Sequence, residues 1–141
     1  MHFIDYLHDH DFSNVLDFII VGFGGAMGAM SRFGVRHLGM FDDNPYYYTV
    51  AINLTGCLII GIIGALFTHF KVGSHWTYFV IVGFLGGYTT YSAFALDAIE
   101  LLNAHMWKEY FIYLSLVIIG GLGLCALGFF GVNRILKLIA S

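Results

Sequence analysis

Charged residues are scarce in this chain. Asp, Glu, Lys and Arg make up 11% of its 141 residues, whereas a soluble domain has about a quarter. Hydrophobic residues account for 59%, and the mean hydropathy is +0.81. This composition excludes an ordinary soluble domain and predicts an all-α integral membrane protein. The net charge of −3 also leaves no excess of basic residues for binding nucleic acid.

Proline and cysteine are rare as well, whereas glycine is abundant. There is one proline, Pro45, and there are two cysteines, Cys57 and Cys125. Both cysteines fall within predicted membrane spans, where small apolar packing is a better interpretation than a disulfide or a metal site. The 18 glycines favour close packing of helices in lipid.

The hydrophobic segments lack the groups that enzymes and proton-coupled transporters need. No Asp or Glu lies in the middle of a span, and Asp97 and Glu100 come only at the end of the third. A proton-coupled transporter needs an ionisable residue inside the membrane. No nucleophile stands beside a base, so we do not expect an enzyme.

Four hydrophobic segments are each close to the roughly 20 residues that cross a bilayer. We expect them to form one four-helix transmembrane domain, residues 16–141, after an N-terminal tail of residues 1–15. They predict a multi-pass membrane protein. The expected spans are Phe18–Leu38, Tyr46–Phe67, Trp76–Leu96 and Tyr110–Val132.

Basic residues give the chain no preferred orientation. Four spans put both termini on one side of the membrane, and each side has three basic residues. The two sets are Lys71, Arg134 and Lys137 on the side of the termini, and Arg32, Arg36 and Lys108 on the other. Because an excess of Lys and Arg normally selects the cytoplasmic side, this tie predicts insertion in both orientations and an antiparallel, two-fold symmetric dimer. A single topology set by other means is the alternative.

The third span contains an unusual run of small and hydroxylated residues, GFLGGYTTYSAF at positions 83–94. The glycine pair weakens a helix, and the threonine pair after it offers hydroxyls and backbone carbonyls at membrane depth. Irregular backbone is tolerated there only where it is buried in protein or lines a cavity. We therefore expect the third helix to be broken in mid-membrane, at the wall of a pore or binding site. Tyr91 and Phe94 share a face there, and aromatic ring edges carry positive partial charge.

Polar residues of the first two spans are candidates for the same wall. Thr49 and Asn53 are four residues apart and share a helix face. They either bond helices together or present donors to an anion. Arg32 either reaches for the membrane surface or draws anions into a vestibule. Arg36, one turn further on, is interpreted as an interfacial anchor.

The chain resembles the Fluc-type (CrcB) fluoride channels over all four spans. The resemblance rests on three motifs, GGAMGAMSRF at 24–33, TVAINLTG at 49–56 and GFLGGYTTYSAF at 83–94. It implies a channel domain that forms an antiparallel, dual-topology homodimer in the lipid bilayer of the plasma (inner) membrane. Each dimer would have two antiparallel pores through which fluoride leaves the cell passively while chloride is rejected.

The resemblance also assigns roles to residues. The aromatic rings that coordinate fluoride through their edges correspond to Tyr91 and Phe94, and the pore asparagine corresponds to Asn53. The other pore candidates are Thr49, Thr90, Ser92, Arg32 and Tyr113. A structural sodium ion on the two-fold axis would be bound by the backbone carbonyls of Gly86 and Thr89 from both subunits.

Three positions depart from the family pattern. Tyr91 stands where Phe is usual, Ala93 where Ser or Thr is usual, and Asp97 where Glu is usual. These departures leave open a heterodimeric fluoride channel in which this chain is one of two different subunits. A small dual-topology multidrug transporter shares the size and the charge tie but needs a carboxylate in the first span, which Phe18–Leu38 lacks. A tetraspan scaffold without transport is the third alternative.

Overall fold

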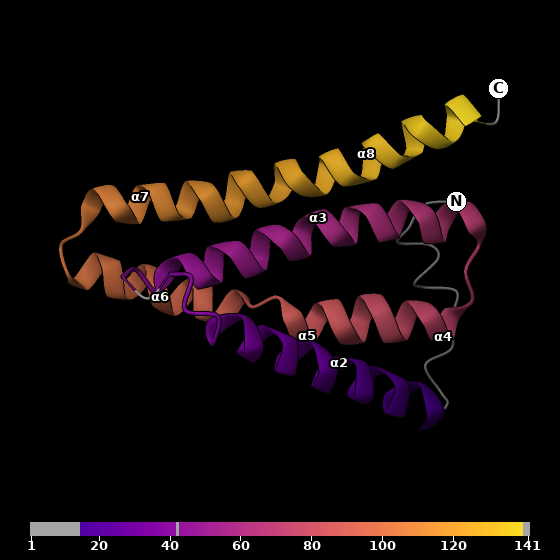
Figure 1. Cartoon of the computed structure of the whole chain (residues 1–141), viewed down its shortest axis with the longest axis horizontal. Helices are drawn as coiled ribbons and strands as arrows, with labels where there is room; N and C mark the ends of the chain where they lie inside the picture. The colour runs from indigo at the N-terminus through magenta and orange to yellow at the C-terminus, as the bar shows by residue number, and fades with distance from the viewer. Residues whose placement is uncertain (1–14, 42, 140–141) are drawn as a thin grey trace.

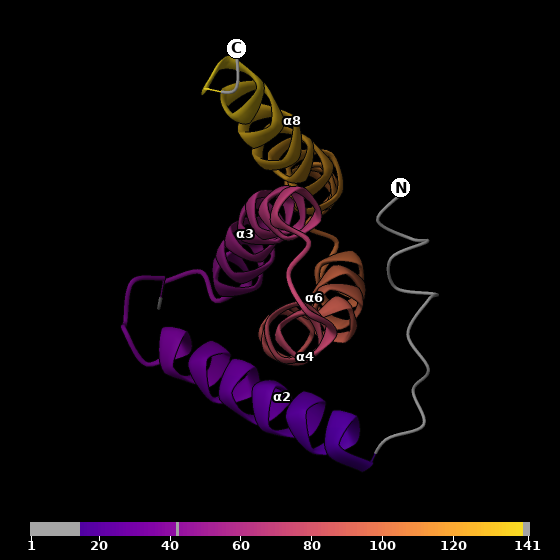
Figure 2. The ribbon, with the colours of Figure 1, turned by 90° about the vertical axis from the view of Figure 1, so that its right-hand side faces the viewer.

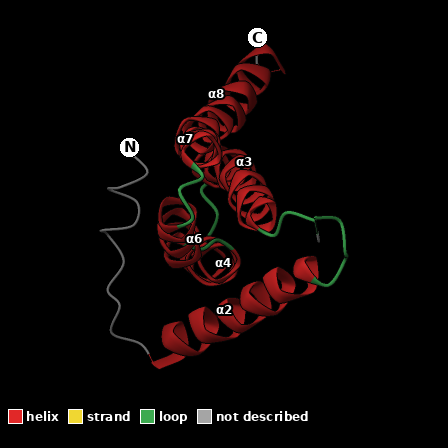
Figure 3. Ribbon diagram, turned by 90° about the vertical axis from the view of Figure 1, so that its left-hand side faces the viewer, coloured by secondary structure: helices red, strands yellow, loops and turns green. Residues whose placement is uncertain are grey.

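The computed structural model of the chain describes residues 15–41 and 43–139. The expected tail, residues 1–15, lies outside the described residues except for its last position. Four helical spans are long and apolar enough to cross a membrane, as the sequence predicts. Figure 3 shows helices and connecting loops, and the described residues form no strand. The spans are Val15–Arg36, Tyr46–Phe70, Ser74–Asn103 and Trp107–Ile139.

Two of the spans are single helices and two are composite. The single helices are α2 (Val15–Arg36) and α3 (Tyr46–Phe70). The third span consists of α4 (Ser74–Thr77), the π-helical segment η1 (Tyr78–Leu85), α5 (Gly86–Tyr88) and, after a break, α6 (Tyr91–Asn103). The fourth consists of α7 (Trp107–Ser115), the π-helical segment η2 (Leu116–Gly120) and α8 (Gly121–Ile139).

The first helix begins three residues earlier than its hydropathy predicts. Asp17 therefore lies in the first turn of α2, where a carboxylate is stabilised by the helix dipole. Its side chain is buried and lies 3.6 Å from the imidazole of His75 (Asp17 Oδ1 to His75 Nε2). The first span thus has a carboxylate after all, but at one end rather than in the middle, where a multidrug transporter needs it.

The helices alternate in direction, so that α2 begins and α8 ends at the same end of the bundle (Figure 1). The turn after α3 and the last turns of α8 contribute three basic residues to this end. The end of α2 and the start of α7 contribute three to the opposite end. The tie counted from the sequence therefore holds for the folded chain.

Neighbours in sequence are not the main packing partners. α2 packs along η1 and α5, and α3 packs along α8, whereas α2 and α3 contact each other far less. Viewed from the end in Figure 2, α2 crosses beneath α4 and α6, and α8 lies on the far side of α3. The first span is thus paired with the third, and the second with the fourth.

Glycines bring α2 into backbone contact with the third span. A Cβ atom at Gly28 would overlap the carbonyl oxygen of Phe84, and one at Gly87 would overlap that of Gly25. Small residues allow this close approach in lipid, where dispersion contacts between helices contribute to association. Gly86 and Gly87 remain helical in α5, so the glycine pair does not itself form the break.

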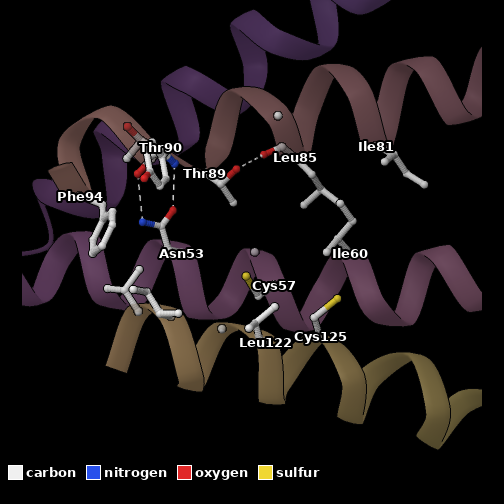
Figure 4. A pocket seen from close by; sticks show the side chains of 16 residues that line it. Asn53, Cys57, Ile60, Ile81, Leu85, Thr89, Thr90, Phe94, Leu122 and Cys125 are labelled. Carbon is white, nitrogen blue, oxygen red and sulfur yellow. Dashed lines mark hydrogen bonds between the residues drawn. The ribbon is translucent and has the colours of Figure 1, made fainter. Parts of the chain in front are cut away.

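The break predicted in the third helix is confirmed, and it falls on the threonine pair. Thr89 has φ −76° and ψ 159°, and Thr90 has φ −150° and ψ 111°, so both residues are extended. Helical geometry resumes at Tyr91 with the start of α6. The break lies beside the first half of α3, where the Asn53 side chain meets it (Figure 4).

Candidate functional site

The side chain of Asn53 holds the break in the third helix. Its Oδ1 accepts a hydrogen bond from the Thr90 N–H at 2.9 Å, and its Nδ2 donates one to the Thr90 carbonyl at 3.1 Å. Both residues are buried. The amide thus replaces the helical partner that the Thr90 N–H loses where the helix stops, and it gives the Thr90 carbonyl a further donor. Because the amide has two N–H groups, one donor remains for another ligand.

Thr90 is also the N-cap of α6. Its Oγ1 accepts a hydrogen bond from the Ala93 N–H at 3.2 Å and lies 3.3 Å from Ser92 Oγ. A helix N-terminus carries unpaired N–H groups and positive partial charge, which favours anions. At position 93 the cap uses the backbone N–H, which alanine supplies as well as serine or threonine would.

The break also frees backbone carbonyl groups. The Leu85 carbonyl accepts from both the N–H and the Oγ1 of Thr89, at 3.0 and 2.9 Å. The Thr90 N–H, which would bond to the Gly86 carbonyl in a continuous helix, is bonded to Asn53 instead. The last turn of α5 therefore presents carbonyl oxygen atoms of the kind that hold Na⁺ at unwound membrane helices.

These groups face a groove of about 500 Å³, which we call the central groove (Figure 4). It runs between α3 and α8 on one side and the third span on the other. Its lining is mostly apolar, with polar groups concentrated at the break. The lining residues are Asn53, Gly56, Cys57, Ile60, Ile81, Leu85, Gly86, Thr89, Thr90, Tyr91, Phe94, Val117, Ile118, Gly121, Leu122 and Cys125.

A row of aromatic rings leads from the central groove toward the end of the bundle at which α2 ends. Tyr91 is 81% exposed at the rim of the groove, and its ring centroid lies 5.5 Å from that of Phe94. Phe94 is buried and stacks on Tyr113 at 5.6 Å. Tyr46 meets Tyr113 edge-on at 6.4 Å. Ring edges along such a row offer positive partial charge in an environment without bulk water.

A second cavity, of about 290 Å³, opens beside the break, and we call it the vestibule. It is walled by the last turns of α2 and by the start of α6. Its lining residues are Ala29, Arg32, Phe33, Arg36, Thr90 and Ala93. The vestibule therefore brings two guanidinium groups to the cap of α6, a combination that concentrates anions.

Polar side chains continue from the vestibule along the aromatic row. Arg36 Nη2 donates to Thr49 Oγ1 at 3.4 Å, and Thr49 is fully buried. The Tyr113 hydroxyl donates to Asp97 Oδ2 at 2.9 Å. These contacts join residues from α2, α3, α6 and α7.

The structure brings most of the pore candidates together, in two groups. Asn53, Thr90 and Ser92 meet at the break, and Tyr91, Phe94 and Tyr113 form the aromatic row. Arg32 lies in the vestibule and Thr49 beside it. Gly86 and Thr89 lie together on the central groove.

Two residues outside the candidate set take part in the polar contacts. Arg36, interpreted from the sequence as an interfacial anchor, instead lines the vestibule and bonds to α3. The sequence could have indicated this role, because Arg36 comes four residues after Arg32 and so shares its helix face. Asp97 lies three residues after Phe94, which likewise puts both on one face of α6.

Fold and site together define a class, the small multi-pass membrane proteins in which a broken helix brings polar groups to mid-membrane. Within this class, the family model described as CrcB-like protein, Camphor Resistance (CrcB), matches residues 19–129. The chain belongs to this family, which confirms the resemblance read from its motifs.

Curated relatives cover most of the chain. It is 38% identical over 114 residues to the fluoride-specific ion channel FluC of Dichelobacter nodosus, an alignment that covers 79% of this chain and 93% of the relative. It is 34% identical over 116 residues to FluC 1 of Listeria monocytogenes serotype 4b, covering 81% and 95%. The match to FluC of Paracoccus denitrificans is 42% over 85 residues, covering 60% and 68%.

These relatives are named as ion channels and not as enzymes, in agreement with the expectation from the sequence. Together with the four spans, the family membership makes this chain a multi-pass protein of the plasma membrane, as predicted.

Proposed function

We propose that the chain forms a fluoride channel through which cytoplasmic fluoride leaves the cell passively. The observation that carries the proposal is the break held by Asn53, where an amide donor and the N-terminus of α6 meet beside a vestibule with two arginines. Relatives that cover most of the chain are named fluoride-specific ion channels, which supports fluoride over other anions.

Fluoride is small and strongly hydrated, so a pore must replace its water with close donors. Such donors are the second N–H of Asn53 and three hydroxyls, those of Thr49, Thr90 and Ser92. The ring edges of the aromatic row add positive partial charge along the same path. Several sites of moderate strength allow an ion both to enter and to leave. Arg32 raises the concentration of anions at the mouth of the pathway.

The direction of flow needs no energy source beyond the membrane potential. Hydrogen fluoride crosses lipid as a neutral molecule and ionises at cytoplasmic pH, which traps fluoride inside. A potential of 100 mV, negative inside, favours exit of a monovalent anion by about 2.3 kcal/mol. A passive pore therefore keeps cytoplasmic fluoride low.

We propose that the functional unit is an antiparallel homodimer with two pores. Two features support this: equal numbers of basic residues at the two ends of the bundle and a mostly apolar central groove with Tyr91 exposed at its rim. A tag on the C-terminus should be accessible from both faces of the inner membrane in cells that express the protein. Labelling from one face alone would exclude the dual topology.

The carbonyls of Gly86 and Thr89 fit a structural sodium ion shared by two subunits. Both residues lie on the central groove, and the break removes the helical partner of the Gly86 carbonyl. Bound sodium would add positive charge near the anion path and satisfy the freed carbonyls. Preparing the protein in sodium-free potassium buffer should lower fluoride flux; unchanged flux would remove sodium from the proposal.

The central experiment is fluoride efflux from proteoliposomes of the purified protein, followed with a fluoride electrode. Valinomycin and potassium compensate the charge movement, and chloride efflux is the selectivity control. Rapid fluoride release without chloride release is the expected result. If folded, dimeric protein releases no fluoride, the homodimeric channel is refuted in favour of a heterodimer or a scaffold.

A further inference from the structure

Arg36 reaches from the last turn of α2 to the first turn of α3. Its Nη2 atom donates to Thr49 Oγ1 at 3.4 Å, a long hydrogen bond to a fully buried hydroxyl. α2 and α3 otherwise contact each other little. The guanidinium thus lies across one side of the vestibule and touches the only polar atom of the Thr49 side chain.

The hydroxyl of Thr49 differs from those of Thr55 and Thr68 in α3 and of Thr89 at the break. Thr55, Thr68 and Thr89 each donate to the carbonyl four residues earlier, at 2.7, 2.8 and 2.9 Å. Among the hydrogen bonds of the described residues, the Thr49 hydroxyl makes no such bond, and its partner is Arg36. The Thr49 hydroxyl proton is therefore not used in a hydrogen bond within α3.

The direction of the Arg36 contact follows from its chemistry. A guanidinium has donors and no acceptor, so the Thr49 oxygen must accept. The hydroxyl proton of Thr49 is then directed away from the guanidinium. Tyr113 lies near Thr49, and its own hydroxyl donates to Asp97 Oδ2 at 2.9 Å, so the Tyr113 proton is already engaged and does not compete for the Thr49 oxygen.

We propose that Arg36 is a positioning residue for anion passage: by donating to Thr49 Oγ1, it turns the Thr49 hydroxyl proton inward, where a passing fluoride ion can accept it. The inference rests on the proposed fluoride pathway and adds Arg36 to it. The donor is thus already oriented when the ion arrives.

The test compares Arg36→Gln with Lys108→Gln in the efflux assay, over a range of fluoride concentrations. Both changes remove one positive charge from the same end of the bundle. Any effect of the lost charge on the orientation in which the chain inserts is therefore the same in the two variants. The glutamine side chain is too short to reach Thr49 as the guanidinium does. Arg36→Gln should lower the maximal rate about three- to tenfold, the effect of one ordinary hydrogen bond, and Lys108→Gln should leave it unchanged.

The same substitution is then made in two Thr49 backgrounds. Thr49→Val removes the hydroxyl, so adding Arg36→Gln should lower the maximal rate no further. Thr49→Ser keeps a hydroxyl, so the effect of Arg36→Gln should remain. This non-additive pattern would not arise if Arg36 only attracted anions or only stabilised the fold, because either effect would persist without the hydroxyl.

Three results have separate meanings. An equal loss from Arg36→Gln with and without the Thr49 hydroxyl overturns the positioning role, even though the wild-type protein conducts fluoride. The same holds if Arg36→Gln raises only the half-saturating fluoride concentration, since that is the effect of a charge at the mouth. If the wild-type protein conducts no fluoride, the proposed function fails first and this inference falls with it.

Discussion

Replacement of Asn53 by leucine tests the central contact of the site. The amide makes two hydrogen bonds to the backbone of Thr90, at 2.9 and 3.1 Å, and both residues are buried. Leucine is similar in size but has no polar atom, so the substitution leaves the Thr90 N–H and carbonyl without these partners.

The expected loss of stability comes mainly from the Thr90 N–H, because the carbonyl of Thr90, the N-cap residue, also accepts the first hydrogen bond within α6. An unsatisfied buried donor costs about 1–3 kcal/mol, so the free energy of unfolding should fall by about this amount. Thr68→Val is a suitable control on the same helix, because its hydroxyl bonds only within α3, to the Gly64 carbonyl at 2.8 Å. It should change the free energy of unfolding far less.

Unfolding in mixed micelles, followed by the fluorescence of Trp76 and Trp107, measures the stability. Fluoride efflux from proteoliposomes measures function, and Asn53→Leu should abolish it. Asn53→Asp separates the two roles of the side chain. A carboxylate can still accept from the Thr90 N–H, so it should retain more stability than leucine, but its negative charge should block the passage of anions.

Two results would refute this reasoning. If Asn53→Leu unfolds with the same free energy as the wild-type protein, the hydrogen bonds to Thr90 do not hold the break. If Asn53→Asp conducts fluoride at the wild-type rate, Asn53 does not line the anion path, whatever it contributes to stability.

Two further substitutions test the aromatic row and the packing of α2. Tyr91→Phe should leave fluoride efflux within about twofold, because the ring edge is retained and one exposed hydroxyl contributes little; a complete loss of efflux would make the phenol essential. Gly28→Ala should destabilise the protein by about 1–3 kcal/mol, since its Cβ would overlap the Phe84 carbonyl, whereas Gly22→Ala on the same helix meets no atom within 4 Å. Equal melting temperatures for these two variants would contradict the packing described for α2.

The sequence predicted the helical class, the four spans and the broken third helix. Hydropathy was sufficient for the spans because apolar segments of this length are rare outside membranes. It was less accurate at their ends: Asp17 and His75 belong to helices but lie outside the predicted spans, since charged and polar residues lower a hydropathy average even where they pair.

The position of the break required information that the sequence does not carry locally. Glycine weakens a helix in isolation, which pointed to Gly86 and Gly87. In the folded chain these residues remain helical beside α2, and the extended residues are Thr89 and Thr90. Asn53 and the α6 cap supply hydrogen-bond partners for Thr90. The partner of the break lies 37 residues away in sequence, so no local pattern reveals it.

The candidate site could be predicted in composition but not in its contacts. Thr49 and Asn53 were selected because polar residues on one face of a membrane helix need partners. Their partners depend on how other helices lie against α3: the third span brings Thr90 to Asn53, and α2 brings Arg36 rather than Arg32 to Thr49. Spacing along one helix gives no information about the angle between two.

The pairing of the first span with the third, and of the second with the fourth, has a consequence for biosynthesis. As the chain leaves the ribosome, the first two spans enter the lipid without their main partners. Each of these two spans can pack against its main partner only after the span two positions later has been made. The order of synthesis is therefore not the order of assembly. A chain that stops after α3 would have two inserted helices and almost no contact between them. Quality control in the membrane would then meet glycine-lined helix faces that are covered only once the whole chain has been made.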